Sequence, residues 1–281
     1  MGTIAVIGAL NIDLIGTSFA EPVPGDSSPG VIRMSAGGVG RNIARSLRAL
    51  GENVQLIAPV SEDADGAFAR ADCARLGISL DGALPVPSSC RYLCVNGPEG
   101  SLRLAVNDMA AMALLTPAEL EARLTLINGC DLIVLDANLS EDALRFLASR
   151  ADLPLVADPV SAPKASRMRG ILSRLSAIKP NRAEAAALTG LSADDAPETL
   201  ARALIRLGVT HVYLSLGGGG MLYAGPDGCF TSPSLARDAV NFNGCGDAAT
   251  AAVAHALRLG LNPRDTAALA MREAAQKARE A

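Results

Sequence analysis

The segment "NFNGCGDAATAAVAHAL", from Asn241 to Leu257, sets two glycines around a cysteine and then an aspartate at the start of an alanine-rich run. Glycine suits a helix N-terminus, where backbone N–H groups lack intrahelical partners and, with the helix dipole, favour an anion. Asp247 would be repelled by an anion bound there, so we expect it to accept a proton or to cap the helix. The segment therefore predicts an anion site, with Asp247 beside it as a proton acceptor or a helix cap.

Two further groups of polar residues stand next to predicted turns. The stretch "AGGVGRN" (36–42) places glycines directly before a helix that starts with Arg41 and Asn42, and "NID" places Asn11 and Asp13 just after the first apolar run. Parallel sheets present ligand-binding side chains at the carboxyl ends of their strands, which makes these residues candidate ligands. A tight loop and a surface turn are the alternative interpretations.

The stretch "KPNRAEA" (179–185) leads into another predicted helix. Asn181 and Glu184 have the oxygen groups that a metal ion bound to phosphates prefers, although a solvated, acidic first turn explains them as well. Further along, "THVYLSLGGGGMLYAGPDG" holds two apolar runs around four glycines, which predicts a hairpin near the edge of a sheet.

Composition excludes several classes of protein. The net charge is −4 and the chain has no Trp, which argues against nucleic-acid binding. No apolar run approaches the roughly 20 residues that span a bilayer, and the N-terminus does not resemble a signal peptide, so we expect a cytoplasmic protein. The six cysteines form no CxxC pair and there are only two histidines, so zinc binding is not expected. A small-molecule partner fits this composition best.

Apolar strands alternate with helical stretches along the chain, which predicts a parallel sheet covered by helices on both faces. Two segments, about 16–36 and 88–106, break this alternation with short strand-like runs between Pro, Gly and Ser. We expect them to form a small β lid on a single domain that spans 1–281. The first strand is followed by "GALNID", which lacks the GxGxxG spacing of a dinucleotide-binding oxidoreductase.

At this point the motifs resemble a known family. "AGGVGRNIARSLRALG" is similar to the N-terminal signature of the PfkB or ribokinase-like carbohydrate and nucleoside kinases, and "NFNGCGDAA" to their C-terminal signature, commonly DTxGAGD. "KPNRAE" and "LSLGGGG" fall between the two signatures, in the order that the family has them. The resemblance covers nearly the whole chain. It implies a ribokinase-like three-layer α/β/α sandwich with a mostly parallel central sheet and a β lid, and an ATP-dependent kinase that acts on an alcohol group.

The resemblance also implies roles for individual residues. Asp247 would be the general base, and the amides of Gly244, Cys245 and Gly246 would form an anion hole for the transferring phosphate. The residues implied in holding the ribose hydroxyls are Asn11, Asp13, Gly38 and Asn42. Those implied in binding the nucleotide are Asn181, Ser215, Gly217, Gly218 and Gly220. Glu184 and Asn181 would order Mg²⁺, mostly through water.

Two departures from the family pattern affect what we expect. Asn241 stands where many relatives have Asp, and Asn243 where they have Thr; these positions help to bind a monovalent cation in some members, so K⁺ at Asn241 is an open candidate. The tail "ALAMREAAQKAREA" is charged where relatives place small and polar residues near adenine. This predicts weak nucleotide binding, or a relaxed choice between ATP and GTP.

Within the family, "GGVGRNIA", "VNDM", "DANLSEDAL" and "DPVSAPKASR" most resemble the kinases that phosphorylate the 5′-hydroxyl of the C-nucleoside pseudouridine. In the lid, Asn107 and Asp108, with apolar Tyr92, Leu93 and Leu104, are expected to face the base. A kinase for ribose or another nucleoside is the alternative, and a non-catalytic nucleoside-binding protein is the alternative from a different class. A lid strand with an apolar face is also expected to pair two subunits in a homodimer.

Overall fold

The computed structural model describes residues 2–236 and 242–279, and its main layer is a sheet of strands in the order β14-β13-β12-β11-β10-β9-β1-β4. The strands of this sheet are β1 (Thr3–Ile7), β4 (Asn53–Ile57), β9 (Leu132–Asp136), β10 (Leu155–Asp158), β11 (Ala177–Ile178), β12 (His211–Ser215), β13 (Met221–Gly225) and β14 (Gly228–Ser232). From β4 to β12 the pairs are parallel, whereas β13 and β14 pair antiparallel at one edge. The mostly parallel sheet and the glycine-rich hairpin are therefore confirmed.

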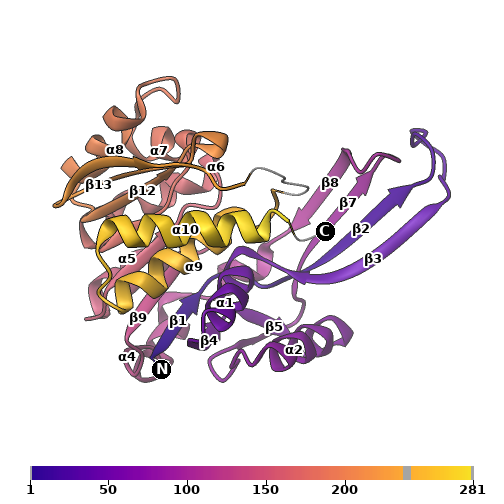
Figure 1. Ribbon diagram of the computed structural model, residues 1–281. Helices are drawn as coiled ribbons and strands as arrows, with labels where there is room; N and C mark the ends of the chain where they lie inside the picture. The colour runs from indigo at the N-terminus through magenta and orange to yellow at the C-terminus, as the bar shows by residue number, and fades with distance from the viewer. Residues whose placement is uncertain (1, 237–241, 280–281) are drawn as a thin grey trace.

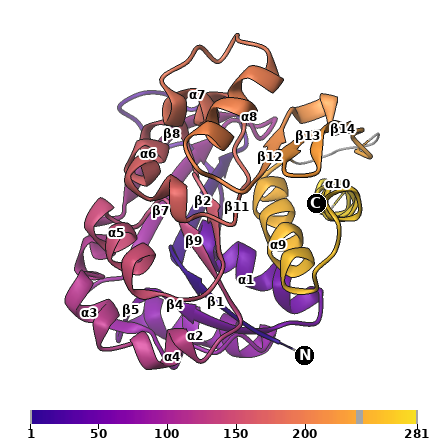
Figure 2. The same cartoon turned by 90° about the vertical axis from the view of Figure 1, so that its left-hand side faces the viewer.

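Helices cover both faces of this sheet (Figure 2). One face packs against α1 (Val39–Ala49), α2 (Ala64–Leu76), α9 (Cys245–Arg258) and α10 (Pro263–Lys277). The other packs against η1 (Ala110–Leu114), α3 (Pro117–Glu121), α4 (Leu124–Asn128), α5 (Glu141–Arg150), α6 (Ala162–Ala165), η2 (Ser166–Arg174), α7 (Arg182–Thr189) and α8 (Pro197–Arg206). A further short 3-10 turn is η3 (Gly217–Gly219). This is the three-layer α/β/α arrangement expected from the resemblance.

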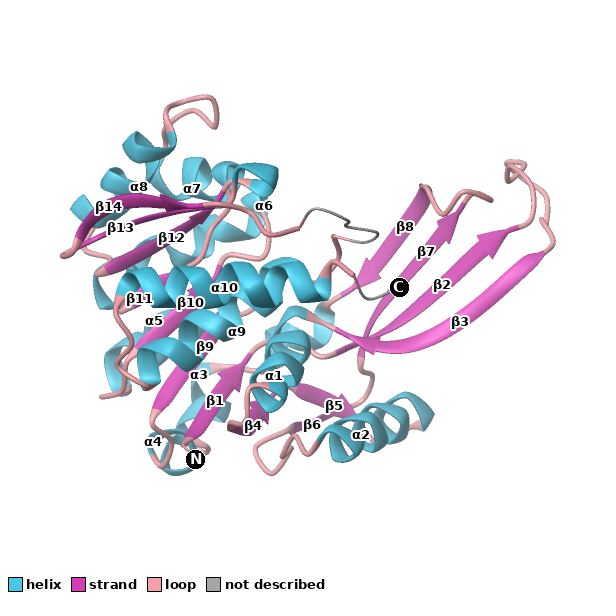
Figure 3. Ribbon diagram, viewed as in Figure 1, coloured by secondary structure: helices cyan, strands magenta, loops and turns pink. Residues whose placement is uncertain are grey.

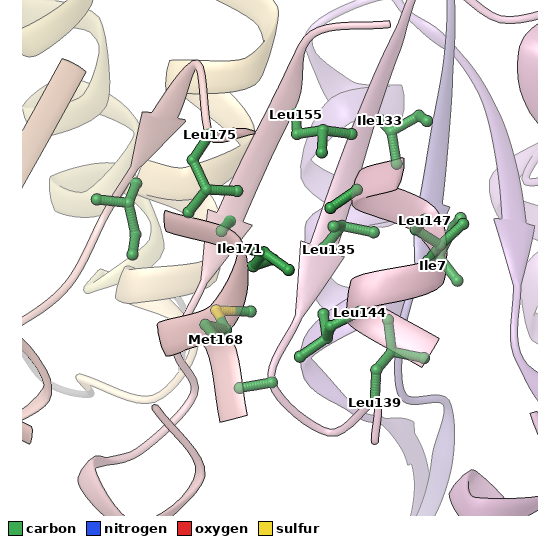
Figure 4. Close-up of a cluster of buried hydrophobic side chains, with 14 of the residues drawn as sticks. Ile7, Ile133, Leu135, Leu139, Leu144, Leu147, Leu155, Met168, Ile171 and Leu175 are labelled. Atoms are coloured by element: carbon green, nitrogen blue, oxygen red, sulfur yellow. The ribbon is translucent and has the colours of Figure 1, made fainter. Parts of the chain in front are cut away.

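The strands read as nearly continuous apolar runs because both of their faces are buried. In Figure 4, Ile7, Ile133 and Leu135 from the sheet lie against Leu144 and Leu147 of α5. Alternate side chains of the same strands belong to the core on the other face, because successive side chains of a strand point in opposite directions. The central strands are thereby fixed from both sides, which gives the residues at their ends a rigid base.

A second sheet, in the order β3-β2-β7-β8, projects from the main layer as a lid (Figures 1 and 3). Its strands are β2 (Asn11–Ser18), β3 (Gly30–Gly37), β7 (Cys90–Asn96) and β8 (Leu102–Asp108). The lid therefore starts at Asn11, earlier than the sequence suggested. A short pair, β5 (Pro59–Ser61) and β6 (Leu84–Val86), lies near its root.

The position of β1 determines where a ligand is expected to bind. β1 lies between β4 and β9 in the sheet. The next strand along the chain, β4, is added on one side of β1, and the later strands from β9 onward are added on the other side. In open α/β sheets, ligands bind outside the carboxyl ends of the strands at such a switch point. The lid leaves the sheet at this carboxyl edge. Among the described residues, no helix is long and apolar enough to cross a membrane.

Candidate active site

The N-terminus of α9 lies at the carboxyl edge of the sheet and has the features of an anion site. Its N-cap is Gly244, with φ of 77°, a left-handed conformation that glycine adopts without strain. Within the described residues, no side chain caps this end of the helix. The amides of Cys245, Gly246 and Asp247 thus belong to the first turn, whose N–H groups have no intrahelical acceptor.

Asp247 stands in that first turn, and its Oδ2 accepts a hydrogen bond of 2.9 Å from Asn42 Nδ2 of α1. Burial and the nearby Asp158 carboxylate raise the pKa of Asp247 to about 7, although Asn42 and Lys179 act in the opposite direction. A carboxyl group with this pKa exchanges a proton near neutral pH, which is the property a general base requires. Through this hydrogen bond the side chain of Asp247 is joined to α1.

The carboxyl ends of β10 and β11 add a buried ion pair beneath this turn. Lys179 Nζ lies 3.3 Å from Asp158 Oδ2, and the side chains are only 6% and 4% exposed. Asp158 Oδ2 also accepts a 2.6 Å hydrogen bond from Thr250 Oγ1 of α9. Burial lowers the pKa of Lys179, but Asp158, Glu184 and Asp247 raise it by more, so the ammonium is kept charged.

This ammonium lies next to the anion site itself. A Cβ added at Gly246 would come 3.1 Å from Lys179 Nζ, so the lysine reaches the first turn of α9 at the one position that lacks a side chain. The first turn thus combines backbone N–H groups, the helix dipole and a buried positive charge. These groups together can stabilise the spread negative charge of a transferring phosphate.

A second polar group occupies the root of the lid. Asn11 donates a hydrogen bond from Nδ2 to Asp13 Oδ1, and burial raises the pKa of Asp13 to about 6, against the opposing effects of Arg41 and Asn11. Gly38 packs against Asn11, because a Cβ there would overlap the Ala9 carbonyl and Asn11 Oδ1, and its φ is 96°. Only glycine lets the backbone pass this close, so the glycines of "AGGVGRN" have a structural reason.

The strand register decides which lid residues share a face with Asp13. One row of paired residues runs across the four strands and consists of Ser35, Asp13, Tyr92 and Asn107. Their side chains therefore share one face of the lid. Asn107 is two strand spacings from Asp13, which is roughly 10 Å.

The expectation that three other lid side chains face the base together with Tyr92 and Asn107 is wrong. Leu93, Leu104 and Asp108 occupy the alternate positions of their strands, which place them on the opposite face from Tyr92 and Asn107. The sequence-based expectation failed because it grouped neighbours in the chain, and neighbours in a strand point to opposite faces.

Asn181 and Glu184 form a capping box at the start of α7. Asn181 Oδ1 accepts from Glu184 N, and the two Glu184 oxygens accept from Asn181 N and Nδ2, at 2.8 to 2.9 Å. Glu184 is only 4% exposed, and burial raises its pKa against the opposing effects of Lys179 and Asn181. The alternative of a solvated first turn is therefore wrong.

A pocket lies next to this capping box, with a cavity volume of about 290 Å³, near the lower end of the usual range for ligand sites. All five residues that the sequence suggested for nucleotide binding line it, namely Asn181, Ser215, Gly217, Gly218 and Gly220. Cys245 and Gly246 of the anion site and Lys179 line it as well. Ser215 pairs with Asn181 across a β-bridge, which fixes the hairpin against the start of α7.

The charged tail does not spoil this pocket. Met271, Ala274, Ala275 and Ala278 of the α10 segment line it, and its charged residue Arg272 is exposed. Helical spacing separates the small apolar residues from the charged ones. The α10 segment therefore contributes small apolar residues to the pocket, and the weak or relaxed nucleotide binding expected from the charged tail stays a prediction.

The structure thus gathers the predicted residues into two adjoining groups. Asn42 and Asp247 are bonded beside Asn11, Asp13 and Gly38, while the nucleotide-pocket residues meet them at Gly246. Asn241 lies outside the described residues. In the described part of the chain, no group of three or more His, Cys, Asp or Glu could hold a metal ion.

Sequence reasoning missed Asp158 and Lys179 as site residues. Each stands where an apolar run ends, in "LPLVADP" and "LSAIKPN", and the carboxyl ends of parallel strands are where functional side chains gather. That signal was available in the sequence.

The family model described as the pfkB family of carbohydrate kinases matches residues 1–281. The chain belongs to this family. The resemblance inferred from the two signatures is therefore confirmed, and with it the assignment as a PfkB-family kinase, a phosphotransferase whose acceptor is an alcohol.

Relatives extend this result. The PfkB-family chain is 34% identical to the pseudouridine kinase of Escherichia coli strain K12, over 89% of this chain and 82% of the relative. It is similar to a solved carbohydrate kinase from Agrobacterium tumefaciens, with a TM-score of 0.87, 29% identity, and coverage of 98% of this chain and 90% of that one. The Arabidopsis thaliana ribokinase that was solved with ribose and ATP shares the fold, with a TM-score of 0.88, 20% identity, and coverage of 99% and 93%.

Proposed function

We propose that this kinase transfers the γ-phosphate of ATP to the 5′-hydroxyl of a nucleoside, and that the nucleoside is pseudouridine. The observation that carries the proposal is the position of Asp247. Its carboxylate has a raised pKa, is oriented by Asn42, and stands in the same helical turn as an anion site backed by Lys179. Phosphoryl transfer to an alcohol needs this combination of a proton acceptor and stabilised negative charge.

In this mechanism the acceptor lies between the lid root and α9. Asp13, Asn11, Asn42 and the Gly38 backbone hold the ribose hydroxyls, because a carboxylate and amides together satisfy a vicinal diol. Asp247 Oδ2 accepts the proton of the 5′-hydroxyl as that oxygen attacks the γ-phosphorus. The bond from the γ-phosphorus to the β,γ-bridging oxygen breaks, and ADP leaves. The amides of Gly244 to Gly246 and the Lys179 ammonium oppose the charge on the transferring group.

The nucleotide belongs to the neighbouring pocket. The small residues of α10 give it an apolar wall, and the glycines of the β12–β13 turn allow a phosphate chain to approach the backbone closely. In the solved Arabidopsis ribokinase complex, ATP is among the bound molecules. We therefore propose that ATP binds here with its γ-phosphate toward Gly246.

Magnesium fits the donor set of this site only as a largely hydrated ion. Glu184 and Asp158 are oxygen donors, the kind that Mg²⁺ prefers, but Glu184 already accepts two hydrogen bonds from Asn181. We propose that Glu184 and Asn181 hold the waters of a phosphate-bound Mg²⁺. When bound, the ion neutralises charge on the phosphates. A K⁺ requirement at Asn241 remains a separate proposal.

We also propose that the lid pairs two copies of this chain. Its face opposite Asp13 carries the exposed apolar side chains Ile32, Met34, Leu93, Leu104 and Val106, with Ile32 79% exposed. An exposed apolar patch of this kind favours a partner. A second copy presents the same patch, so a two-fold axis would cover both.

The proposed acceptor is tested by competition kinetics with ATP, Mg²⁺ and pseudouridine, uridine or ribose. The expected result is the highest kcat/KM for pseudouridine. An equal or higher kcat/KM for ribose would favour a ribokinase, because the proposed ribose ligands at the root of the lid would then be sufficient to explain substrate binding. Tight nucleoside binding without any ATP turnover would instead favour a binding protein.

A further inference from the structure

The first turn of α1 holds a cation whose position needs an explanation. Arg41 is only 6% exposed and stands two residues after Val39, the first residue of α1. A positive charge at this end of a helix is opposed by the helix dipole, and a guanidinium is rarely buried without a partner. Arg41 has no part in the proposed mechanism, so its hydrogen bonds must show what it does.

Asp72 of α2 is the partner that accounts for the burial of Arg41. Asp72 Oδ2 accepts a hydrogen bond of 2.9 Å from Arg41 Nε and another from Arg41 Nη2. The side chain of Asp72 is only 12% exposed, so this ion pair is largely shielded from water. Because a guanidinium is planar, two bonds to one carboxylate fix the direction of its remaining N–H groups.

The third nitrogen of Arg41 reaches Asn42. Arg41 Nη1 donates to Asn42 Oδ1 at 3.3 Å, and Asn42 Nδ2 donates to Asp247 Oδ2 at 2.9 Å. A guanidinium has only donors and an ionised carboxylate has only acceptors, so the Asn42 amide satisfies both partners in just one of its two orientations. In the flipped orientation, the amide oxygen would face the Asp247 carboxylate and the amide NH₂ group would face the guanidinium.

We propose that Arg41, held by Asp72, is a positioning residue that fixes the orientation of the Asn42 amide and so keeps its N–H aimed at the proposed general base. The inference rests on the proposed function, because it concerns the same Asp247 carboxylate. An amide NH₂ group has two donors, so the same orientation leaves the second N–H of Asn42 for a ribose hydroxyl. A residue of α2 thereby acts on the reacting end of α9.

Loss of this orientation would change the pKa of Asp247 in a defined direction. Burial, Asp158 and Asp136 raise that pKa, whereas the hydrogen bond from Asn42 and the charge of Lys179 lower it. A flipped amide would remove the hydrogen bond and bring an oxygen next to the carboxylate, so the pKa should rise further. The rise of kcat/KM with pH should then occur at a higher pH.

The test is Arg41→Lys, which keeps the positive charge that acts on Asp13 but replaces the planar fork with a single ammonium. The pH at which kcat/KM for pseudouridine rises should shift upward by roughly 0.3 to 1 pH unit, the equivalent of one modest hydrogen bond. Arg41→Met, which removes every donor, should shift it at least as far. The measurement is the pH profile of kcat/KM.

A double-mutant cycle separates this role from a merely structural one. In an Asn42→Ala background there is no amide to orient, so Arg41→Lys should shift the profile no further than Asn42→Ala alone. Arg75→Met is the matched control, because Arg75 is an exposed cation of α2 that bonds the same Asp72 carboxylate. It should leave the profile in place.

An unchanged profile in both Arg41 variants would overturn the inference and leave the proposed function intact. An equal upward shift in the Asn42→Ala background would also overturn it, since Arg41 would then act by another route. If the wild-type protein transfers no phosphate from ATP to any nucleoside or sugar, the proposed function fails and this inference fails with it.

Discussion

Asp247 is the residue on which the proposed reaction depends, and its neighbours set its affinity for a proton. Burial and Asp158 raise its pKa, while Asn42 and Lys179 lower it. A base of this kind is ionised in a useful fraction near neutral pH yet is stronger than an ordinary aspartate. In the proposed reaction, these local charges would suit the Asp247 carboxylate for proton transfer.

The first prediction follows from this balance. Because only the ionised carboxylate accepts a proton, kcat/KM should rise with pH through about 7 and then level off. Asn42→Ala removes a donor that stabilises the ionised form, so the limb should move to higher pH. Asp158→Asn removes a like charge, so the limb should move to lower pH. The measurement is the pH profile of kcat/KM, which reports the free enzyme.

Asn42 is also a proposed ribose ligand, so we expect kcat/KM of the Asn42→Ala variant to be lower at every pH. The pH at which kcat/KM rises is independent of that overall loss. Ser140→Ala, which removes the N-cap of α5, is a control that should leave the limb in place. If the pH at which kcat/KM rises is unchanged in both site variants, or shifts in the same direction in both, Asp247 is not the titrating group.

At the scale of elements, helix ends and strand ends supply the site. Asn181 and Glu184 show the difficulty of assigning such residues a role, since their capping box starts α7 and also places Asn181 in the wall of the proposed nucleotide pocket. The two functions respond differently to mutation. A cap affects the stability of the helix, whereas a ligand of hydrated Mg²⁺ affects the metal dependence of turnover.

The second prediction separates these functions with Glu184→Gln. The neutral amide can still accept one hydrogen bond from Asn181, so the loss of stability should stay within the 0.5–2 kcal/mol that is typical of a lost cap. The Mg²⁺ concentration for half-maximal rate should rise several-fold. Magnesium titration of the rate and thermal unfolding check the two effects, with Ser140→Ala as a capping control that alters stability alone. An unchanged magnesium dependence would leave only the capping role.

The elements themselves were largely predictable from the sequence. Alternating apolar runs and helical spacing gave the parallel sheet, and glycine runs marked the α9 N-terminus and the β12–β13 turn, because these signals are local. What depends on pairing was not predictable. The face of Leu93 is set by the register of β7 against β2, and the contact of Asn42 with Asp247 joins residues 205 positions apart.

At the scale of the whole molecule, the lid carries two opposite surfaces. One presents Asp13, Tyr92 and Asn107, and the other presents an exposed apolar patch that includes Ile32, Leu104 and Val106. In the proposed dimer, the lid would serve the site with one face and pair with a second copy through the other.

The third prediction is that the protein is a dimer which Ile32→Lys with Val106→Lys converts to monomers, because two charges on each apolar patch oppose its burial. Sedimentation velocity over a range of protein concentrations measures the change. Arg33→Glu is a matched control, since Arg33 lies between Ile32 and Met34 in β3 but points to the other face. A wild-type protein that sediments as a monomer at all concentrations would rule out the lid dimer.

The central claim is that Asp247 is the general base of phosphoryl transfer, and Asp247→Asn tests it most directly. The amide cannot take the proton, so kcat for pseudouridine should fall by roughly 10²- to 10⁴-fold, while the Kd values for ATP and pseudouridine change little. A raised carboxyl pKa means that folding loses stability as pH rises from the unfolded value through about 7, so at pH 8 the variant should melt no lower than the wild type. Turnover near the wild-type rate in this folded variant would contradict the account.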